Sequence, residues 1–450
     1  MPLNHATPAA GTLKLFGRQV TKHDTPLVPR TDKEQEEFNR KPYLLYLEGG
    51  PGFGNKEPQD HSITKTALDK GYTLLLLDYR GTGLSTPINQ PHLATLGGPQ
   101  EQADYLKHFR ADSIVRDAEA VRLCLTEQYQ YPDAYKKWSI FGQSFGGFVA
   151  LTYLSQFPQG LREVFLTGGL APVKRRAEEV YTSLYKKVIQ RNEVYYRKFP
   201  EDVERVRKVA RFLNENEKPI RLPGGGEFTV ERLLGIGLCM GFNGGLDLVH
   251  STILKLATDI EQFGFITRAA GAAFEGLVPF DLAPIYAILH EAIYVNGSEH
   301  GASNWAAYRV GKKLAADGIE PGLGWLSSTD EALSADTTKP LYFSGEMVYP
   351  AHFYCYPELK DMRQTAEILA TYDQWPELYD MDQLARNEVP VYAASYTEDM
   401  YVDADFARET ARAVKGTKVF ETNVMYHGAL RAKTEEVLGQ LFKLRDDTLD

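Results

Sequence analysis

The chain has 450 residues, enough for two or three structural units, and 43% of them are hydrophobic while 24% are charged. Its 60 acidic residues outnumber its 50 lysines and arginines, which gives a formal net charge of −10. No stretch is rich in lysine and arginine, and none approaches the roughly 20 apolar residues of a membrane helix, so we expect neither a nucleic-acid partner nor a membrane span.

The cysteines and the first residues of the chain indicate a compartment. Cys124, Cys239 and Cys355 are far apart and form no C-x-x-C pair, so the sequence predicts neither a disulfide framework nor a zinc ribbon. Residues 1–11 lack the basic segment and apolar run of a secretory signal. We therefore expect a cytoplasmic protein, and we leave open whether it forms a homo-oligomer.

Short apolar runs alternate with helical patterns in the first part of the chain. The predicted strands are residues 43–47, 72–77, 138–141 and 164–167, and the predicted helices are residues 112–130 and 148–157. Strands of this kind, alternating with helices, are typical of a parallel sheet that is covered on both faces.

The pattern changes in the middle of the chain. Residues 174–215 are charged and rich in tyrosine, with apolar side chains at helical spacing, and no clear strand–helix alternation follows before about residue 380. Strand patterns return at residues 389–394 and 418–421, with a helix at 406–414 between them. We predict one α/β domain in two pieces, residues 1–171 and 381–450, with a large, mainly helical cap inserted at residues 172–380.

A candidate nucleophile lies where the third predicted strand ends. Residues 142–146 have the sequence G-Q-S-F-G, which matches G-x-S-x-G and is centred on Ser144. A strand leads in and an apolar helix leads out, as in the nucleophile elbow of α/β-hydrolases, where a sharp turn exposes the serine hydroxyl. The sequence therefore predicts the α/β-hydrolase fold with Ser144 as the nucleophile; a plain strand–helix turn is the alternative for the motif alone.

A serine hydroxyl needs a base and an orienting acid, which follow the serine in this fold in the order acid, then histidine. His427 comes after the last predicted strand and is the predicted base. The loop after strand 389–394 offers Glu398, Asp399 and Asp403 as the acid. We prefer Asp399, a few residues past the strand end, because Asp403 could instead cap the helix that follows.

Acyl transfer also needs hydrogen-bond donors for the developing oxyanion. We expect them to be the backbone N–H of Phe145, directly after the nucleophile, and that of Gly50 in the G-G-P-G loop at residues 49–52. Residues 290–294 start like the helix of a zinc protease, but Tyr294 stands where the second histidine is needed. We therefore expect no metal and no other cofactor.

Five segments together resemble the proline iminopeptidase (prolyl aminopeptidase) family of α/β-hydrolases. They are E-G-G-P-G at 48–52, D-Y-R-G-T-G-L-S at 78–85, G-Q-S-F-G-G at 142–147, D-M-Y-V-D at 399–403 and Y-H-G at 426–428. The resemblance implies an enzyme that releases N-terminal proline from small peptides through an acyl-enzyme. Glu48 departs from the pattern, since the family often has histidine or glutamine there.

The resemblance also implies carboxylates that hold the substrate's free amine. Glu291 and Glu346, in the predicted cap, resemble two such family positions, and a carboxylate in a partly dry pocket stabilises a cation. Two other functions stay open: an esterase, amidase or aminopeptidase of different preference, and a non-catalytic scaffold that binds a ligand.

Overall fold

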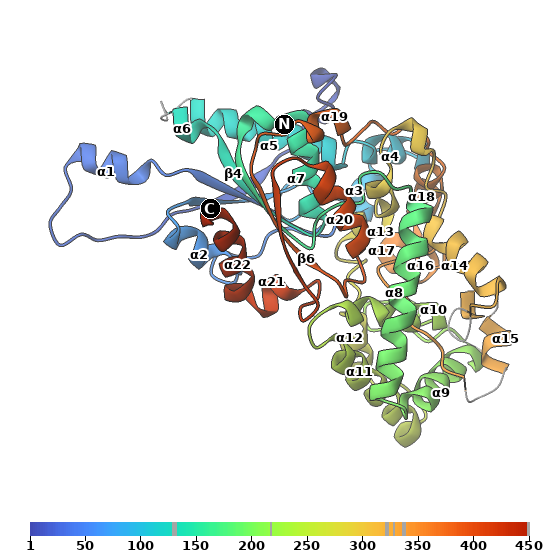
Figure 1. Cartoon of the computed structure of the whole chain (residues 1–450). Coiled ribbons are helices and arrows are strands. Elements are labelled where there is room, and N and C mark those ends of the chain that lie inside the picture. The colour runs from blue at the N-terminus through green and yellow to red at the C-terminus, as the bar shows by residue number, and fades with distance from the viewer. Residues whose placement is uncertain (128–132, 217, 320–323, 327–328, 335–338, 448–450) are drawn as a thin grey trace.

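The computed structural model describes residues 1–127, 133–216, 218–319, 324–326, 329–334 and 339–447. These residues form a seven-stranded sheet in the order β1-β3-β2-β4-β5-β6-β7 (Figure 1). Its strands are β1 Phe16–Val20, β2 Tyr43–Leu47, β3 Thr73–Asp78, β4 Trp138–Gln143, β5 Leu161–Thr167, β6 Val391–Tyr396 and β7 Thr417–Thr422. β1 is antiparallel to β3, and all the other neighbours are parallel, as the predicted fold class requires.

The six predicted strands correspond to β2 through β7, and β1 was not predicted. The β1 sequence, F-G-R-Q-V, alternates half-buried and exposed side chains at the edge of the sheet. An edge strand that is solvated on one side needs no continuous apolar run, so the pattern that indicates the inner strands is absent from it.

The inner strands are buried on both faces of the sheet. Leu45 and Leu75 belong to one hydrophobic cluster, and Leu44 and Leu74 belong to the other, because successive side chains of a strand point to opposite faces. The first cluster includes side chains of α5 (Ala111–Glu127) and α7 (Phe145–Gln156), and the second includes those of α2 (Thr64–Asp69) and α22 (Thr434–Asp446). α5 covers most of the predicted helix 112–130, whose residues 128–130 lie outside the described part of the chain.

Helices fill the chain between β5 and β6, and Figure 1 shows most of them gathered to one side of the sheet, while the last of them lies near α7. They are α8 Ala177–Lys198, α9 Asp202–Glu215, α10 Val230–Gly235, α11 Gly245–Phe263, α12 Arg268–Glu275, α13 Pro284–Ile288, α14 Ala306–Ala316, α15 Thr329–Ser334, α16 His352–Cys355, α17 Pro357–Lys360, α18 Arg363–Ala370 and α19 Met381–Ala385. The helical character of this segment agrees with the predicted cap, while the boundaries at 171/172 and 380/381 stay predictions.

Shorter elements complete the fold. The other α-helices are α1 Asp32–Asn39, α3 Gln90–Ala94, α4 Pro99–Leu106, α6 Asp133–Lys136, α20 Ala404–Ala413 and α21 Ala429–Ala432. The 3₁₀-helices are η1 Pro8–Ala10, η2 Pro158–Gly160, η3 Ile236–Gly241, η4 Glu291–Tyr294, η5 Ser298–His300 and η6 Gly324–Leu326. Within the described ranges, no helix combines the length and the apolar character that crossing a bilayer requires.

The sheet topology brings three predicted site residues to one edge. Ser144 directly follows β4, Asp399 follows β6, and His427 follows β7. β4, β5, β6 and β7 run parallel to one another, so their carboxyl ends meet at the same edge, where ligands of open α/β sheets bind.

Candidate active site

Ser144 occupies a sharp turn between β4 and α7. Its φ of 55° lies in the left-handed region, which costs energy for a residue with a Cβ. Two backbone hydrogen bonds hold the turn: Ser144 N donates to Thr167 O at 3.0 Å, and Gly147 N donates to Ser144 O at 2.7 Å. The turn places the serine at the amino end of α7, where the helix dipole is positive.

Gly146 lets α7 pack against the sheet. A Cβ at this position would lie 1.9 Å from the carbonyl oxygen of Leu47, a backbone atom of β2. No side-chain rotation can relieve such a clash, so the helix or the strand would have to move. This close approach explains why the position after Phe145 has no side chain.

We expect Gly146→Ala to lower the free energy of unfolding by at least about 3 kcal/mol, because overpacking against backbone is among the costlier substitutions. Gly439→Ala is the matched control: Gly439 lies on α22 with open space around its Cβ position, so alanine should stabilise that helix by about 0.5–1 kcal/mol. Thermal unfolding followed by circular dichroism measures both. Equal melting temperatures for the two variants would contradict the clash.

Ser144, His427 and Asp399 form a chain of hydrogen bonds. The Ser144 Oγ lies 2.8 Å from His427 Nε2, and His427 Nδ1 lies 2.7 Å from Asp399 Oδ2. The other oxygen of Asp399 accepts hydrogen bonds from the backbone N–H groups of Tyr401 at 2.8 Å and Val402 at 3.0 Å. These bonds fix the carboxylate so that it faces the imidazole.

The environment of His427 favours its protonated form. Burial of the ring disfavours the imidazolium, but the carboxylate of Asp399 outweighs this effect and raises the pKa of His427. The ring of Tyr401 packs against the imidazole, with 4.5 Å between the ring centroids. The imidazole is therefore oriented on one side by a carboxylate and on another by an aromatic ring, and it can accept a proton from Ser144.

The two other acids of the same loop are engaged elsewhere. Asp403 Oδ1 accepts hydrogen bonds from the backbone N–H groups of Asp405 and Phe406, both at 2.9 Å, so Asp403 caps α20. Glu398 lies 3.9 Å from the Lys187 ammonium, and about half of its side chain is exposed. Of the three candidates, Asp399 is the one that the structure brings into hydrogen-bond contact with His427.

The predicted oxyanion donors lie beside Ser144. A Cβ at Gly49 would be 3.1 Å from Ser144 Cβ, so the G-G-P-G loop runs directly against the nucleophile, and Gly50 lines the same cavity. Phe145 is the first residue of α7, whose first N–H groups have no acceptor within the helix. The N–H groups of Gly50 and Phe145 are therefore the candidates to face the carbonyl oxygen of a substrate.

Glu48, the departure from the family pattern, is bound by the first N–H of this loop and by an arginine. Its Oε1 accepts a hydrogen bond from Gly49 N at 2.8 Å and lies 3.3 Å from Arg431 Nη2. The side chain of Glu48 is almost fully buried, and the arginine supplies the opposite charge that such a carboxylate needs.

A cavity of about 60 Å³ contains the nucleophile and the base. Its lining residues come from the core and from the helical segment: Gly49, Gly50, Phe53, Gln143, Ser144, Phe242, Tyr286, Glu346, Tyr401, His427, Gly428 and Arg431. The hydroxyl of Tyr286 donates a hydrogen bond of 2.6 Å to Glu346 Oε1. Burial raises the pKa of Glu346 to about 7. A cation entering this cavity would meet a carboxylate that ionises readily in its presence.

Glu291, the first residue of η4, directs its carboxylate to the start of α14. Its Oε2 accepts a hydrogen bond from Ala306 N at 3.0 Å, and its Oε1 accepts one from Ala307 N at 2.9 Å. Burial raises the pKa of Glu291 to about 7, although these two hydrogen bonds favour the carboxylate. Glu346 is part of the lining of the cavity that contains Ser144, whereas Glu291 is absent from that lining.

Several lining residues were not predicted as site residues, among them Tyr286, Tyr401 and Arg431. Tyr401 is close to Asp399 in the sequence, and Arg431 closely follows His427, so proximity to a predicted residue is a signal for both. Tyr286 offers no such signal, because its contact with Glu346 depends on how two distant parts of the helical segment pack.

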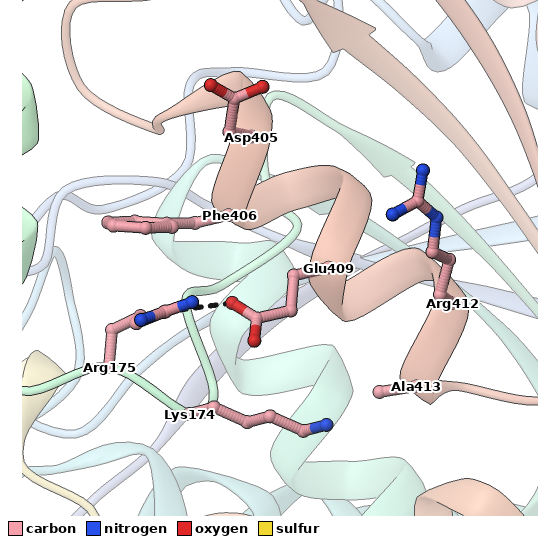
Figure 2. A pocket seen from close by; sticks show the side chains of 7 residues that line it. All are labelled: Lys174, Arg175, Asp405, Phe406, Glu409, Arg412 and Ala413. Carbon is pink, nitrogen blue, oxygen red and sulfur yellow. Dashed lines mark hydrogen bonds and ion pairs between the residues drawn. The ribbon is translucent and has the colours of Figure 1, made fainter.

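A larger hollow of about 500 Å³ lies beside α20 (Figure 2). Its lining residues are Lys174, Arg175, Asp405, Phe406, Glu409, Arg412 and Ala413. Figure 2 shows Arg175 paired with Glu409, whose oxygen lies 2.9 Å from Arg175 Nε. This lining has no serine, cysteine or histidine, so nucleophilic chemistry is assigned to the smaller cavity.

The chain is similar to known proteins in fold and in sequence. Residues 42–209 match the model of the alpha/beta hydrolase fold family. The chain is 41% identical to a proline iminopeptidase of Aeromonas sobria, over 99% of this chain and 95% of that protein. It is also 38% identical to a proline iminopeptidase of Aspergillus aculeatus, over 100% of this chain and 93% of that protein. With this identity over essentially the whole length, the chain belongs to the proline iminopeptidase family of α/β-hydrolases.

Proposed function

We propose that the chain is a serine aminopeptidase that releases N-terminal proline from peptides, with Ser144, His427 and Asp399 as its catalytic triad. The names of the two full-length relatives support proline as the substrate residue. The observation that carries the proposal is the cavity itself, in which a carboxylate, Glu346, lies in the same lining as the nucleophile and the base.

The proposed reaction proceeds through an acyl-enzyme. The Ser144 Oγ attacks the carbonyl carbon of the N-terminal residue while His427 Nε2 takes the hydroxyl proton. The N–H groups of Gly50 and Phe145 stabilise the oxyanion that develops. His427 then donates its proton to the leaving amine, and a water molecule, deprotonated by the same imidazole, hydrolyses the ester on Ser144.

The cavity chemistry supports a proline at the acyl position. Glu346 would hold the protonated imino nitrogen, and Tyr286 orients this carboxylate through its hydroxyl. Phe53, Phe242 and Tyr401 add aromatic side chains to the lining, which suits an apolar pyrrolidine ring.

The three cysteines support a cytoplasmic enzyme. Cys124, Cys239 and Cys355 are all free thiols, which is the usual state of cysteines in a reducing compartment.

The experiment that tests this function compares proline p-nitroanilide with N-acetylproline p-nitroanilide. Acetylation removes the positive charge that Glu346 is proposed to bind, and a hydrogen bond to a charged group contributes about 1.5–3 kcal/mol. We therefore expect kcat/KM to be at least about 10-fold higher for proline p-nitroanilide, whose ring nitrogen is a free secondary amine, than for the acetylated substrate. Equal values of kcat/KM would favour the esterase or amidase alternative. No release from either substrate, together with no labelling of Ser144 by a fluorophosphonate, would favour a ligand-binding scaffold.

The two glutamates should respond differently to substitution by glutamine. Glu346→Gln should raise KM for proline p-nitroanilide by about 10- to 100-fold, since the amide leaves the substrate cation without a charged partner. Glu291→Gln replaces one acceptor with a donor beside the N–H groups of Ala306 and Ala307, so it should cost about 1–2 kcal/mol of stability with a smaller effect on KM. Steady-state kinetics and thermal unfolding of both variants check this, and a larger KM change in Glu291→Gln would reverse the assignment.

The pH profile provides an independent test of Glu346. Since burial raises the pKa of Glu346 to about 7, its side chain is mostly neutral at lower pH and mostly ionised at higher pH. The ratio of kcat/KM between wild type and Glu346→Gln should therefore approach one on the acid side of this pKa and widen on the basic side. The ionised Glu346 also raises the pKa of His427, but on the acid side Glu346 is neutral, so the loss of the His427 base there affects both proteins alike. A ratio that does not change with pH would contradict the role of the Glu346 charge.

A further inference from the structure

Arg431 places a second charge in the lining of the same cavity. It lies on α21, which begins directly after His427 and Gly428. Its side chain is 52% exposed, although the carboxylate of its partner, Glu48, is buried. The residue thus both lines the cavity that contains Ser144 and reaches solvent.

Most N–H donors of the Arg431 guanidinium make no hydrogen bond to the described residues. Arginine carries five N–H donors, and within the described part of the chain the side chain of Arg431 makes one hydrogen bond, from Nη2 to Glu48 Oε1 at 3.3 Å. The same oxygen of Glu48 also accepts the N–H of Gly49 at 2.8 Å. The remaining donors can bind a planar anion in the paired geometry that arginine forms with carboxylates.

The chemistry of the proposed reaction places the leaving residue near this side chain. His427 Nε2 must protonate the leaving nitrogen, so the leaving residue starts next to the imidazole. The positive charge of Arg431 acts on the same ring, where it opposes the effect of Asp399 on the pKa of His427. In a dipeptide, the carboxylate carbon is two bonds from the leaving nitrogen, which brings the carboxylate close to the place where the guanidinium lies.

We propose that Arg431 binds the α-carboxylate of the leaving amino acid, so that the enzyme favours dipeptides with an N-terminal proline. This inference rests on the proposed function and adds the class of substrate. Glu346 and Arg431 would then bind the two charged ends of the same dipeptide, one on each side of the scissile bond. A longer peptide carries its carboxylate farther from the leaving nitrogen and gains less from Arg431.

The test compares prolylglycine with prolylglycinamide, whose uncharged amide replaces the carboxylate. In wild type, kcat/KM for the dipeptide should exceed that for the amide by about 10- to 100-fold, as expected for a charge-assisted, paired hydrogen bond. Arg431→Gln should bring this preference close to one. Arg431→Lys, which keeps a point charge and lacks the fork of donors, should retain part of the preference. Glycine and glycinamide release, quantified by mass spectrometry, are the readouts.

Glu48→Gln is the complementary variant. The glutamine can still accept the N–H of Gly49 while it no longer competes for the guanidinium, so the dipeptide preference should rise above that of wild type. Each variant is compared through its own ratio of dipeptide to amide, which removes differences in the leaving groups and in the overall rate.

Proline p-nitroanilide, which has no carboxylate, distinguishes a failure of the role proposed for Arg431 from a failure of the proposed function. If wild type releases nitroaniline and the dipeptide preference is the same in wild type, Arg431→Gln and Glu48→Gln, the role of Arg431 is overturned and the proposed function stands. If wild type hydrolyses none of the three proline substrates, the proposed function itself fails.

Discussion

Replacing Ser144 with alanine should lower kcat for proline p-nitroanilide by about 10⁴- to 10⁶-fold, because the acyl-enzyme can no longer form. The fold should be unaffected. Alanine keeps the Cβ, so the turn with φ of 55° is no more strained than before, and the two backbone hydrogen bonds of the elbow need no hydroxyl. Steady-state kinetics and thermal unfolding together distinguish a chemical loss from a structural one.

Ser155→Ala is the matched control for this substitution. Ser155 lies on the same helix, α7, is also buried, and donates its hydroxyl to Leu151 O at 3.0 Å. It has no contact with the hydrogen-bonded chain of Ser144, so kcat should be unchanged. Residual turnover in Ser144→Ala comparable to that of Ser155→Ala would mean that a different group carries the reaction.

Asp399→Asn should lower kcat by about 10⁴-fold, the order of magnitude for an orienting acid that is replaced by its amide. The backbone N–H groups of Tyr401 and Val402 require an acceptor at Oδ1, so the amide oxygen of asparagine would take that place. Its NH₂ group would then face His427 Nδ1 and favour the tautomer that carries its proton on Nε2. That tautomer cannot accept the Ser144 proton.

Asp403→Asn provides the comparison for the acid. Asparagine caps helices about as well as aspartate, so α20 should keep its two capping bonds. Both kcat and the melting temperature of Asp403→Asn should therefore equal those of wild type. Kinetics of the two amide variants at the same pH decide between the loop's carboxylates. A large loss in Asp403→Asn with little change in Asp399→Asn would exchange the two roles.

The sheet was predictable because its inner strands are buried on both faces. Continuous apolar runs such as residues 43–47 have few alternatives to an inner strand when turn residues and helical patterns surround them. β1 was not predicted because it is not buried on both faces, and its exposed positions carry a polar side chain or glycine. Local pattern is informative where burial is complete and weak where one side of a strand is solvated.

The candidate site was predictable to the extent that topology determines it. Ser144, Asp399 and His427 each follow a strand of the same parallel sheet, so their order in the chain and their positions at strand ends are enough to bring them together. The lining that comes from the helical segment follows no such rule. The hydrogen bond between Tyr286 and Glu346, and those that Glu291 accepts from the start of α14, depend on helix packing that no local pattern encodes.

Covalent labelling tests the central claim most directly. A fluorophosphonate reacts with a serine only where a base activates the hydroxyl and donors stabilise the oxyanion. Mass spectrometry of the labelled wild-type protein, followed by peptide mapping, should find one adduct per chain, on Ser144, and no adduct in Ser144→Ala. An unlabelled wild-type protein, or an adduct that persists in Ser144→Ala, would contradict the account.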